Sequence, residues 1–172
     1  MRLKKKLLLI LLCALWAGSG KAQEAQLLEA ADFAPALIRQ IHSAQSRVVL
    51  ATYVFRLRPK GRTAELAHEL AAARKRGVKV EVFLEETGKN DSLDRSNRQA
   101  AKWLKARGIL VHFDRPERRS HAKVAVVDGE YCFVGSHNLT ESALRYNHEM
   151  SLLVRSVDLA RQIERGLERN YR

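Results

Sequence analysis

Two segments of this chain repeat the order helix, glycine, strand. An amphipathic pattern over residues 63–76 ends at Gly77 and is followed by the apolar segment 78–84. A similar pattern over residues 92–107 ends at Gly108, before a second short apolar segment. Glycine commonly follows the last turn of a helix because it adopts the left-handed conformation without steric cost. This alternation predicts an α/β fold in which helices flank a mixed, largely parallel sheet.

The remaining apolar patterns extend this fold in both directions. They predict helices over residues 33–44 and 157–169, and strands over residues 47–55, 122–127, 131–134 and 147–154. Asp128 and Gly129 lie between two of these strands, and Asp-Gly is a strong signal for a hairpin turn. No linker or low-complexity stretch divides residues 23–172, so we expect one domain over that range.

The first 22 residues have the pattern of a secretory signal peptide. Four basic residues within positions 2–6 precede an apolar run over residues 7–17, and small residues follow at the expected cleavage positions. This run is short for a membrane span, which needs about 20 residues, so a cleaved signal is favoured over an uncleaved anchor. Cys13 follows Leu12 rather than a small residue, which argues against a lipoprotein. We therefore expect a periplasmic or secreted protein with no stable membrane insertion after the signal is removed.

Charge and cysteine content give weaker guidance. The full chain has 31 Lys and Arg against 19 Asp and Glu, and removal of residues 1–22 takes away five basic residues and leaves a net charge of +7. A basic balance is compatible with attraction to a polyanion and equally with an ordinary solvated surface. Cys132 would then be the only cysteine, so no internal disulfide is possible and we interpret it as a small buried apolar residue.

A set of polar residues over positions 121–138 is the strongest functional signal. His121 and Lys123 are two positions apart in an expected strand, so their side chains point to the same face. An imidazole beside an ammonium group makes a poor metal site and a good phosphate site. Ser136, after Gly135, could add a hydroxyl donor where the next strand ends.

Two other members of this set also have structural interpretations. Asn138, with Glu141 three residues later, has the sequence of a helix N-terminal cap, and helix N-termini are also where backbone donors meet anions. Asp128 can be explained by the turn alone, or it can both form the turn and brace the site. The other histidines show no zinc-binding spacing and no glycine-rich phosphate loop is present, so we expect neither a metal nor another cofactor.

In order and spacing, this set resembles the HKD signature of the phospholipase D superfamily: His121, Lys123, Asp128, Gly135, Ser136 and Asn138. The resemblance covers nearly all of residues 23–172 and implies phosphodiester hydrolysis through a phosphohistidine intermediate. It implies the following catalytic residues: His121, Lys123, Asp128 and Glu149. It implies the following phosphate-binding residues: Lys123, Ser136 and Asn138. Within the resemblance, Glu149 holds the imidazole of His121 in its working tautomer and orientation.

The signature occurs once in this chain. In-line displacement at phosphorus requires a nucleophile on one side and an acid on the other, and one histidine cannot occupy both sides. Short members of the superfamily resemble the bacterial Nuc-type endonuclease, a homodimer with its site on the two-fold axis. Because a two-fold axis places identical surfaces face to face, we expect a homodimer in which two copies of His121 share one phosphate.

The signature alone does not identify the diester. Nucleic acid, with DNA favoured over RNA, is indicated by the single-signature form, the basic charge and the four basic residues of segment 56–62. That segment could border the site, but a solvated basic turn is an equally good interpretation. Tyr53 and Phe55 could stack on bases, although their strand positions favour core packing. The alternatives are a phospholipase acting on membrane diesters and a catalytically silent nucleic-acid-binding protein.

Overall fold

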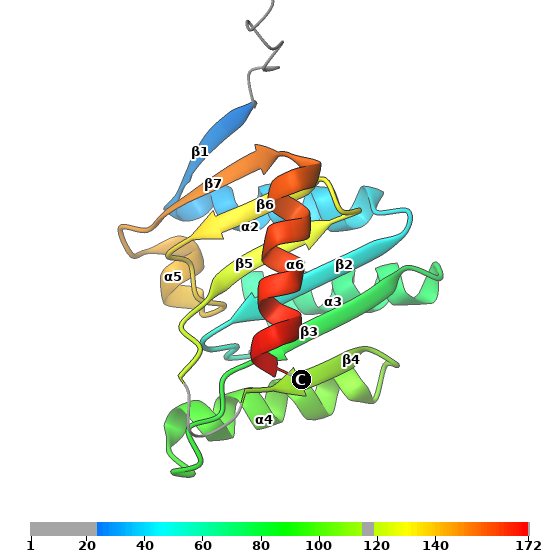
Figure 1. Ribbon diagram of the computed structural model, residues 1–172. Coiled ribbons are helices and arrows are strands. Elements are labelled where there is room, and N and C mark those ends of the chain that lie inside the picture. The colour runs from blue at the N-terminus through cyan, green and yellow to red at the C-terminus, as the bar shows by residue number, and fades with distance from the viewer. Residues whose placement is uncertain (1–23, 115–118, 172) are drawn as a thin grey trace, which may run out of the picture.

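The structure is a computed structural model that describes residues 24–114 and 119–171. The strands are β1 (Ala25–Glu29), β2 (Arg47–Thr52), β3 (Lys79–Leu84), β4 (Leu110–Phe113), β5 (Lys123–Val127), β6 (Tyr131–Gly135) and β7 (Met150–Arg155). The helices are α2 (Ala30–Ser43), α3 (Arg62–Lys75), α4 (Ser92–Lys105), α5 (Glu141–Arg145) and α6 (Val157–Tyr171). In this part of the chain the strands form one seven-stranded sheet with the order β1-β7-β6-β5-β2-β3-β4 (Figure 1).

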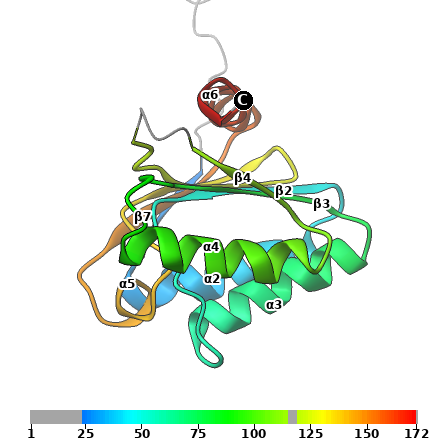
Figure 2. The same cartoon turned by 90° about the horizontal axis from the view of Figure 1, so that it is seen from below.

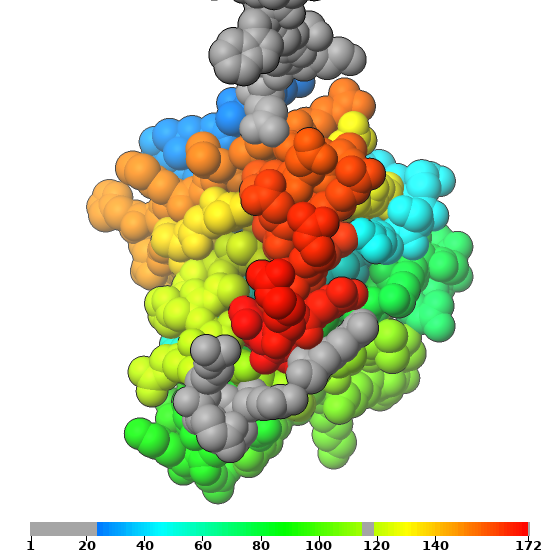
Figure 3. Space-filling view, in the orientation of Figure 1, coloured from blue at the N-terminus to red at the C-terminus, as the bar shows by residue number. Residues whose placement is uncertain are grey.

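Helices cover both faces of the sheet. α2, α3, α4 and α5 lie on one face, and α6 alone lies on the other (Figure 2). Side chains of β2 alternate between these layers: Val48 and Leu50 belong to the core under α2 and α3, whereas Val49 and Ala51 pack towards α6. Because both of its faces are covered, β2 is apolar at nearly every position. Figure 3 shows α6 crossing the middle of its face, with the surface of β1, β6 and β7 beside it.

The mixed α/β sheet flanked by helices is confirmed, with a smaller parallel part than expected. Among the strands of the described residues, only β2, β3 and β4 pair in parallel. These are the strands joined through α3 and α4, because a parallel connection requires a crossover segment. The four other pairings are antiparallel, including the β5-β6 hairpin at Asp128 and Gly129. The helix–glycine–strand repeat therefore describes only one half of the sheet.

The helix after the signature begins later than expected. Thr140, not Asn138, is the N-cap of α5, and its hydroxyl accepts the backbone N–H of Ala143. Glu141 does not complete a capping box; its carboxylate accepts the backbone N–H of Thr63 at 2.8 Å in the first turn of α3. The cap interpretation of Asn138 is therefore wrong, because the chain continues extended through Leu139 before it turns.

The N-terminal part of the chain holds one prediction that stays untested and one strand that was not predicted. The expected signal peptide, residues 1–22, lies outside the described residues. Strand β1, which the apolar pattern did not predict, pairs with β7 along the sheet edge. Across residues 24–114 and 119–171, the structure contains no helix of the length and apolarity that crossing a membrane requires. Cys132 is free and buried, as predicted, and burial raises the pKa of its thiol to about 11.

One end of the strands collects the polar residues of the signature. The parallel strands β2, β3 and β4 all finish at this end, where the antiparallel strands β5 and β7 begin. The strand register places Lys123 opposite Thr52, the last residue of β2. In open α/β sheets the carboxyl ends of parallel strands are the usual place for a ligand. The fold therefore positions the signature where a site is expected.

Candidate active site

His121 and Lys123 are in direct contact at the start of β5. The Nζ atom of Lys123 lies 3.0 Å from Nδ1 of His121 and donates a hydrogen bond to the backbone oxygen of His121 at 2.8 Å. The imidazole is exposed, whereas the Lys123 side chain is half-buried. The proximity predicted from their spacing is thus present in the structure.

The environment of this pair favours a neutral imidazole. Burial, and the positive charges of Lys123 and Arg119, lower the pKa of His121 below its usual value. A neutral ring has a free lone pair, which a nucleophile or general base requires. Burial also lowers the pKa of Lys123, and the charge of Glu149 opposes that shift.

Tyr53 contacts both His121 and Lys123, whereas its strand position had favoured core packing. Its ring packs against His121 with the ring centroids 4.5 Å apart, and Nζ of Lys123 lies 5.2 Å from its centroid. Tyr53 directly follows β2, whose last residue is opposite Lys123. Its place at the end of a central strand was the available signal. Phe55, by contrast, is buried in the core, as its strand position suggested.

Ser136 and Glu149 form a second polar pair beside the first. The hydroxyl of Ser136 donates to one carboxylate oxygen of Glu149, and Nδ2 of Asn147 donates to the other at 3.0 Å. Burial raises the pKa of Glu149, but these hydrogen bonds and the charges of His137 and Lys123 hold it below its usual value. Glu149 is therefore an ionised carboxylate at neutral pH, within electrostatic range of Lys123.

The expected contact between Glu149 and His121 is not among the hydrogen bonds of the described residues. β6 lies between β5 and β7 in the sheet. The carboxylate of Glu149, just before β7, therefore accepts from Ser136, just after β6, and not from a residue near β5. The same contact engages the hydroxyl proton that was expected to bind phosphate. In this arrangement Ser136 orients Glu149 and does not present a free donor.

Gly135 permits the close approach of β6 and β7 on which this pair depends. A Cβ atom at this position would lie 2.1 Å from Oγ of Ser151 and 2.4 Å from the backbone oxygen of Met150. His137, at the variable position of the signature, is buried and stacked on Phe33 with the ring centroids 4.4 Å apart. Its Nδ1 lies 2.7 Å from Oγ of Ser151, so its role is in packing.

Asn138 is the remaining residue of the signature at this end of the sheet. Its side-chain oxygen is buried and has no hydrogen-bond partner among the described residues. An unmade hydrogen bond of this kind is costly. This oxygen is an acceptor, so a hydrogen-bond donor could satisfy it and a phosphate oxygen could not.

Asp128 lies away from the other signature residues, at the far end of β5. It adopts φ 51° in the hairpin turn, and its carboxylate accepts the backbone N–H groups of Gln45, Ser46 and Arg47. It is five residues beyond Lys123 along the strand, roughly 17 Å at the usual rise per residue. The expected catalytic role of Asp128 is not supported by this position. The turn interpretation, extended by bracing of the segment before β2, describes it correctly.

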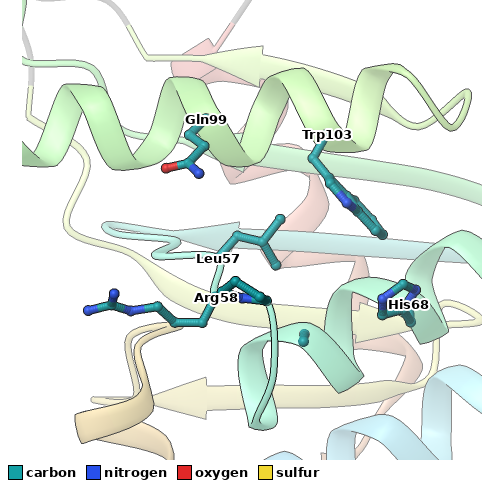
Figure 4. Close-up of a pocket in the computed structure, with 7 residues that line it drawn as sticks. Leu57, Arg58, His68, Gln99 and Trp103 are labelled. Atoms are coloured by element: carbon teal, nitrogen blue, oxygen red, sulfur yellow. The ribbon is translucent and has the colours of Figure 1, made fainter.

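The basic segment 56–62 begins beside the signature and then runs along the helical layer. The backbone N–H of Arg56 donates to the oxygen of Leu139 at 2.8 Å, which ties the segment to the residue after Asn138. Further along, it borders a cavity of about 190 Å³ between α3 and α4 (Figure 4). His68 and Trp103 meet there edge to face, and the guanidinium of Arg58 points away from them. This cavity is separate from the site around His121.

Metal-binding chemistry finds no support in the part of the chain that the structure describes. There, no group of three or more His, Cys, Asp or Glu side chains is arranged to hold an ion. The charge opposite a bound anion would come from Lys123 and Arg119 instead.

Comparison with known proteins agrees with this geometry. A family model described as "Cardiolipin synthase, PLD-like domain" matches residues 37–171. The chain belongs to the phospholipase D superfamily. Among its superfamily relatives, cardiolipin synthase B of Escherichia coli (strain K12) is 32% identical over 125 residues, which cover 66% of this chain and 29% of the relative. The chain thus spans less than a third of the length of that synthase.

Two solved structures of similar length share the phospholipase D fold. Nuc from Salmonella typhimurium, a phospholipase D family member, superposes with a TM-score of 0.73 at 24% identity, over 86% of this chain and 93% of Nuc. NucT from Helicobacter pylori gives a TM-score of 0.66 at 20% identity, over 86% of this chain and 95% of NucT. At such identities the likeness concerns the fold.

Proposed function

We propose that this protein is a metal-independent phosphodiesterase, an endonuclease that cleaves DNA at a site shared by two copies of the chain. The observation that carries the proposal is the 3.0 Å contact between the Lys123 ammonium and a His121 imidazole whose pKa is lowered. A neutral nucleophile beside a fixed positive charge suits attack on an anionic diester.

The reaction has two steps. First, a ring nitrogen of His121 attacks phosphorus; the P–N bond forms and the P–O bond to the leaving group breaks, while His121 of the partner subunit protonates the leaving oxygen. That second histidine then takes a proton from water, whose oxygen displaces the first histidine and completes the hydrolysis. Lys123 and Asn138 of both copies hold the non-bridging oxygens. Glu149, oriented by Ser136, balances the charge of Lys123.

The substrate assignment rests on size, charge and the surroundings of the site. This chain covers almost the whole of two structures named Nuc and NucT, and it has a net charge of +7 without residues 1–22. Arg56 and Arg58 are exposed in the segment that begins beside Leu139. Positive side chains that border a phosphate site are suited to contact a nucleic-acid backbone.

A lipid phosphodiester is the second candidate substrate. The observation that favours it is the 32% identity to cardiolipin synthase B, which exceeds the identity to either nuclease-like structure.

An assay of the purified protein in EDTA distinguishes these functions. We expect cleavage of plasmid DNA that is unchanged by the chelator, because the charged groups of the site are side chains. Single-stranded oligonucleotide, RNA and vesicles containing phosphatidylglycerol or cardiolipin are assayed in parallel. Turnover of the lipids alone would overturn the nuclease assignment. DNA binding without cleavage would overturn catalysis, and activity that EDTA removes and magnesium restores would overturn the metal-independent mechanism.

An exposed apolar surface supports the shared site. Four side chains, each between 38% and 61% exposed, lie on the face of the sheet that α6 leaves uncovered: Leu27, Val134, Met150 and Leu152. Leu152 is the cross-strand partner of both Val134 and Leu27, so the residues are contiguous. Met150 directly follows Glu149. An apolar surface that begins at the site is well placed to bring a second copy to it.

We expect Leu152→Lys to weaken dimerisation and, with it, activity. A lysine in the middle of this surface would bury an unpaired charge in the interface. Leu110→Lys is the matched control, because Leu110 is 51% exposed on the opposite edge strand β4. Light scattering at several concentrations, together with the nuclease assay, measures both effects. A Leu152→Lys protein that remains a fully active dimer would exclude this surface, and a fully active wild-type monomer would exclude the shared site.

A further inference from the structure

Two buried acids lie directly behind the catalytic histidine, and the proposed mechanism does not use them. Glu85 follows the last residue of β3 and is 1% exposed; Asp114 follows the last residue of β4 and is 5% exposed. Acidic side chains are almost never so buried unless they are paired. The carboxylate of Glu85 accepts the backbone N–H of Ser120 at 2.6 Å, and Ser120 immediately precedes His121.

A second contact holds the same residue from the other side. The hydroxyl of Tyr171, at the end of α6, donates to Oγ of Ser120. Tyr171 is itself fixed, because its buried ring packs edge to face on Phe83 with the centroids 5.0 Å apart. Phe83 lies on the face of β3 that packs against α6, and Glu85 comes two positions later, just after the strand. The backbone before His121 is thus held between the sheet and α6.

A buried amide joins this support to the other neighbour of the imidazole. The side-chain nitrogen of Asn97 donates to the backbone oxygens of Glu85 at 2.8 Å and Tyr53 at 2.9 Å. Its side-chain oxygen accepts the N–H of Phe55 at 2.7 Å. The chain segments that follow β2 and β3 are therefore tied together. They carry Tyr53, which packs on His121, and Glu85, which accepts from the backbone of Ser120. Tyr53 and Glu85 are therefore both held by Asn97, a residue of α4.

The charge state of the acid pair is compatible with this role. Burial raises the pKa of Glu85, and the charge of Asp114 and a hydrogen bond between the two carboxyl groups raise it further. The N–H of Ser120 and the charge of Arg119 act in the opposite direction. The geometry carries the role: a carboxyl oxygen of Glu85 accepts from the backbone N–H of Ser120.

We propose that Glu85 is a positioning residue for His121: its carboxyl, paired with Asp114, fixes the Ser120 backbone and so sets the imidazole in line with phosphorus. This inference rests on the proposed catalytic role of His121. In-line attack is sensitive to placement, because an error of about 1 Å can cost roughly 10²-fold in rate. Tyr171 is the second anchor of the same segment.

Three substitutions at Glu85 test this role. Glu85→Ala removes the acceptor, and we expect kcat to fall about 10²-fold with KM nearly unchanged. Glu85→Asp keeps the carboxyl group but shortens the side chain, so the contact with Ser120 is lost and kcat is expected to fall roughly 10-fold. Glu85→Gln can accept from Ser120 while its amide donates to Asp114. We expect it to restore kcat to within about three-fold of wild type, because it keeps the length and the acceptor oxygen of the side chain.

Glu81→Gln is the matched control. Glu81 lies on the same face of the same strand, is 7% exposed and pairs with Lys79 and His112, away from Ser120. We expect this variant to keep the wild-type kcat. Equal losses in Glu81→Gln and Glu85→Ala would reduce the role of Glu85 to general stability and overturn the inference.

The pH dependence of stability gives a readout that is independent of activity. Because the folded-state pKa of Glu85 is raised, its contribution to stability is complete below its unfolded pKa and is lost as pH rises through the folded value. Glu85→Gln removes this loss, so its thermal stability relative to wild type should increase with pH across that interval. The pKa of Glu81 is lowered, since Lys79 and His112 outweigh burial, so its contribution is lost as pH falls. The thermal stability of Glu81→Gln relative to wild type should therefore not increase with pH as that of Glu85→Gln does.

The possible results separate this inference from the proposed function. Activity that survives His121→Ala would overturn the proposed function itself. An inactive His121→Ala protein together with a wild-type kcat in Glu85→Ala or Glu85→Asp would overturn only the positioning role. If Glu85→Ala does not fold, the Asp and Gln variants decide the question: a kcat loss in Asp with recovery in Gln supports the role, and equal values overturn it.

Discussion

His121→Ala is expected to reduce phosphodiester cleavage to background, a loss of at least about 10⁴-fold. In a shared site, one substitution removes both the nucleophile and the acid that protonates the leaving group. The change removes only an exposed ring at the start of β5, so the fold should be retained. His42→Ala is the control, because His42 is an exposed histidine that contacts Glu69 on the helical face. Steady-state cleavage of plasmid DNA and a thermal melt measure the two properties.

Mixed dimers extend this test to the sharing of the site. When wild-type and His121→Ala chains are unfolded together and refolded in equal amounts, about a quarter of the dimers contain two intact histidines. We therefore expect about a quarter of the wild-type activity. Retention of about half would mean that each chain works alone, which would contradict a site formed by two subunits.

Gly135→Ala is expected to destabilise the protein by about 3 kcal/mol and to lower its melting temperature by roughly 10 °C. The added Cβ would meet the backbone oxygen of Met150 and Cα of Ser151, both at 2.4 Å, and backbone atoms cannot move aside as a flexible side chain can. β6 and β7 would have to separate, which would also displace Ser136 from Glu149. We therefore expect cleavage activity to fall in the protein that remains folded.

Gly166→Ala is the control for Gly135→Ala. Gly166 lies within α6, and a Cβ there would meet nothing within 4 Å. Alanine is favoured over glycine inside a helix by about 0.5–1 kcal/mol, so this change should raise the melting temperature. Calorimetry of both variants tests the opposite signs. Destabilisation by Gly166→Ala, or a neutral Gly135→Ala, would contradict the packing described for these positions.

Local patterns predicted the individual elements better than their partners in the sheet. The hairpin at Asp128 and Gly129 and the helices that end before Gly77 and Gly108 are present near their expected positions. The antiparallel half of the sheet was underestimated, because an apolar strand has the same composition whichever direction its neighbour runs. β1 was missed for a related reason. It is an edge strand with mostly exposed side chains, so its alternation of apolar and polar residues is weak.

In the candidate site too, contacts within one segment were easier to predict than contacts between segments. The contact between His121 and Lys123 could be predicted because side chains two positions apart in an extended chain point to the same side; β5 itself begins at Lys123. The distant position of Asp128 is equally a property of that strand, since Asp128 follows Lys123 by five positions of extended chain. The order of residues in the signature did not predict this separation, because order along the sequence does not measure distance in space.

The sequence by itself determined the superfamily and singled out the histidine and lysine proposed to act in catalysis, since these depend on residue types at short spacing. Only the tertiary structure decided that Tyr53 packs on His121, that Glu85 holds the residue before it and that Glu149 turns to Ser136. These residues come from different strands, and their proximity follows from the order in which the strands pair. That order is set by the burial of both faces of the sheet, a property of the whole chain that no local pattern contains.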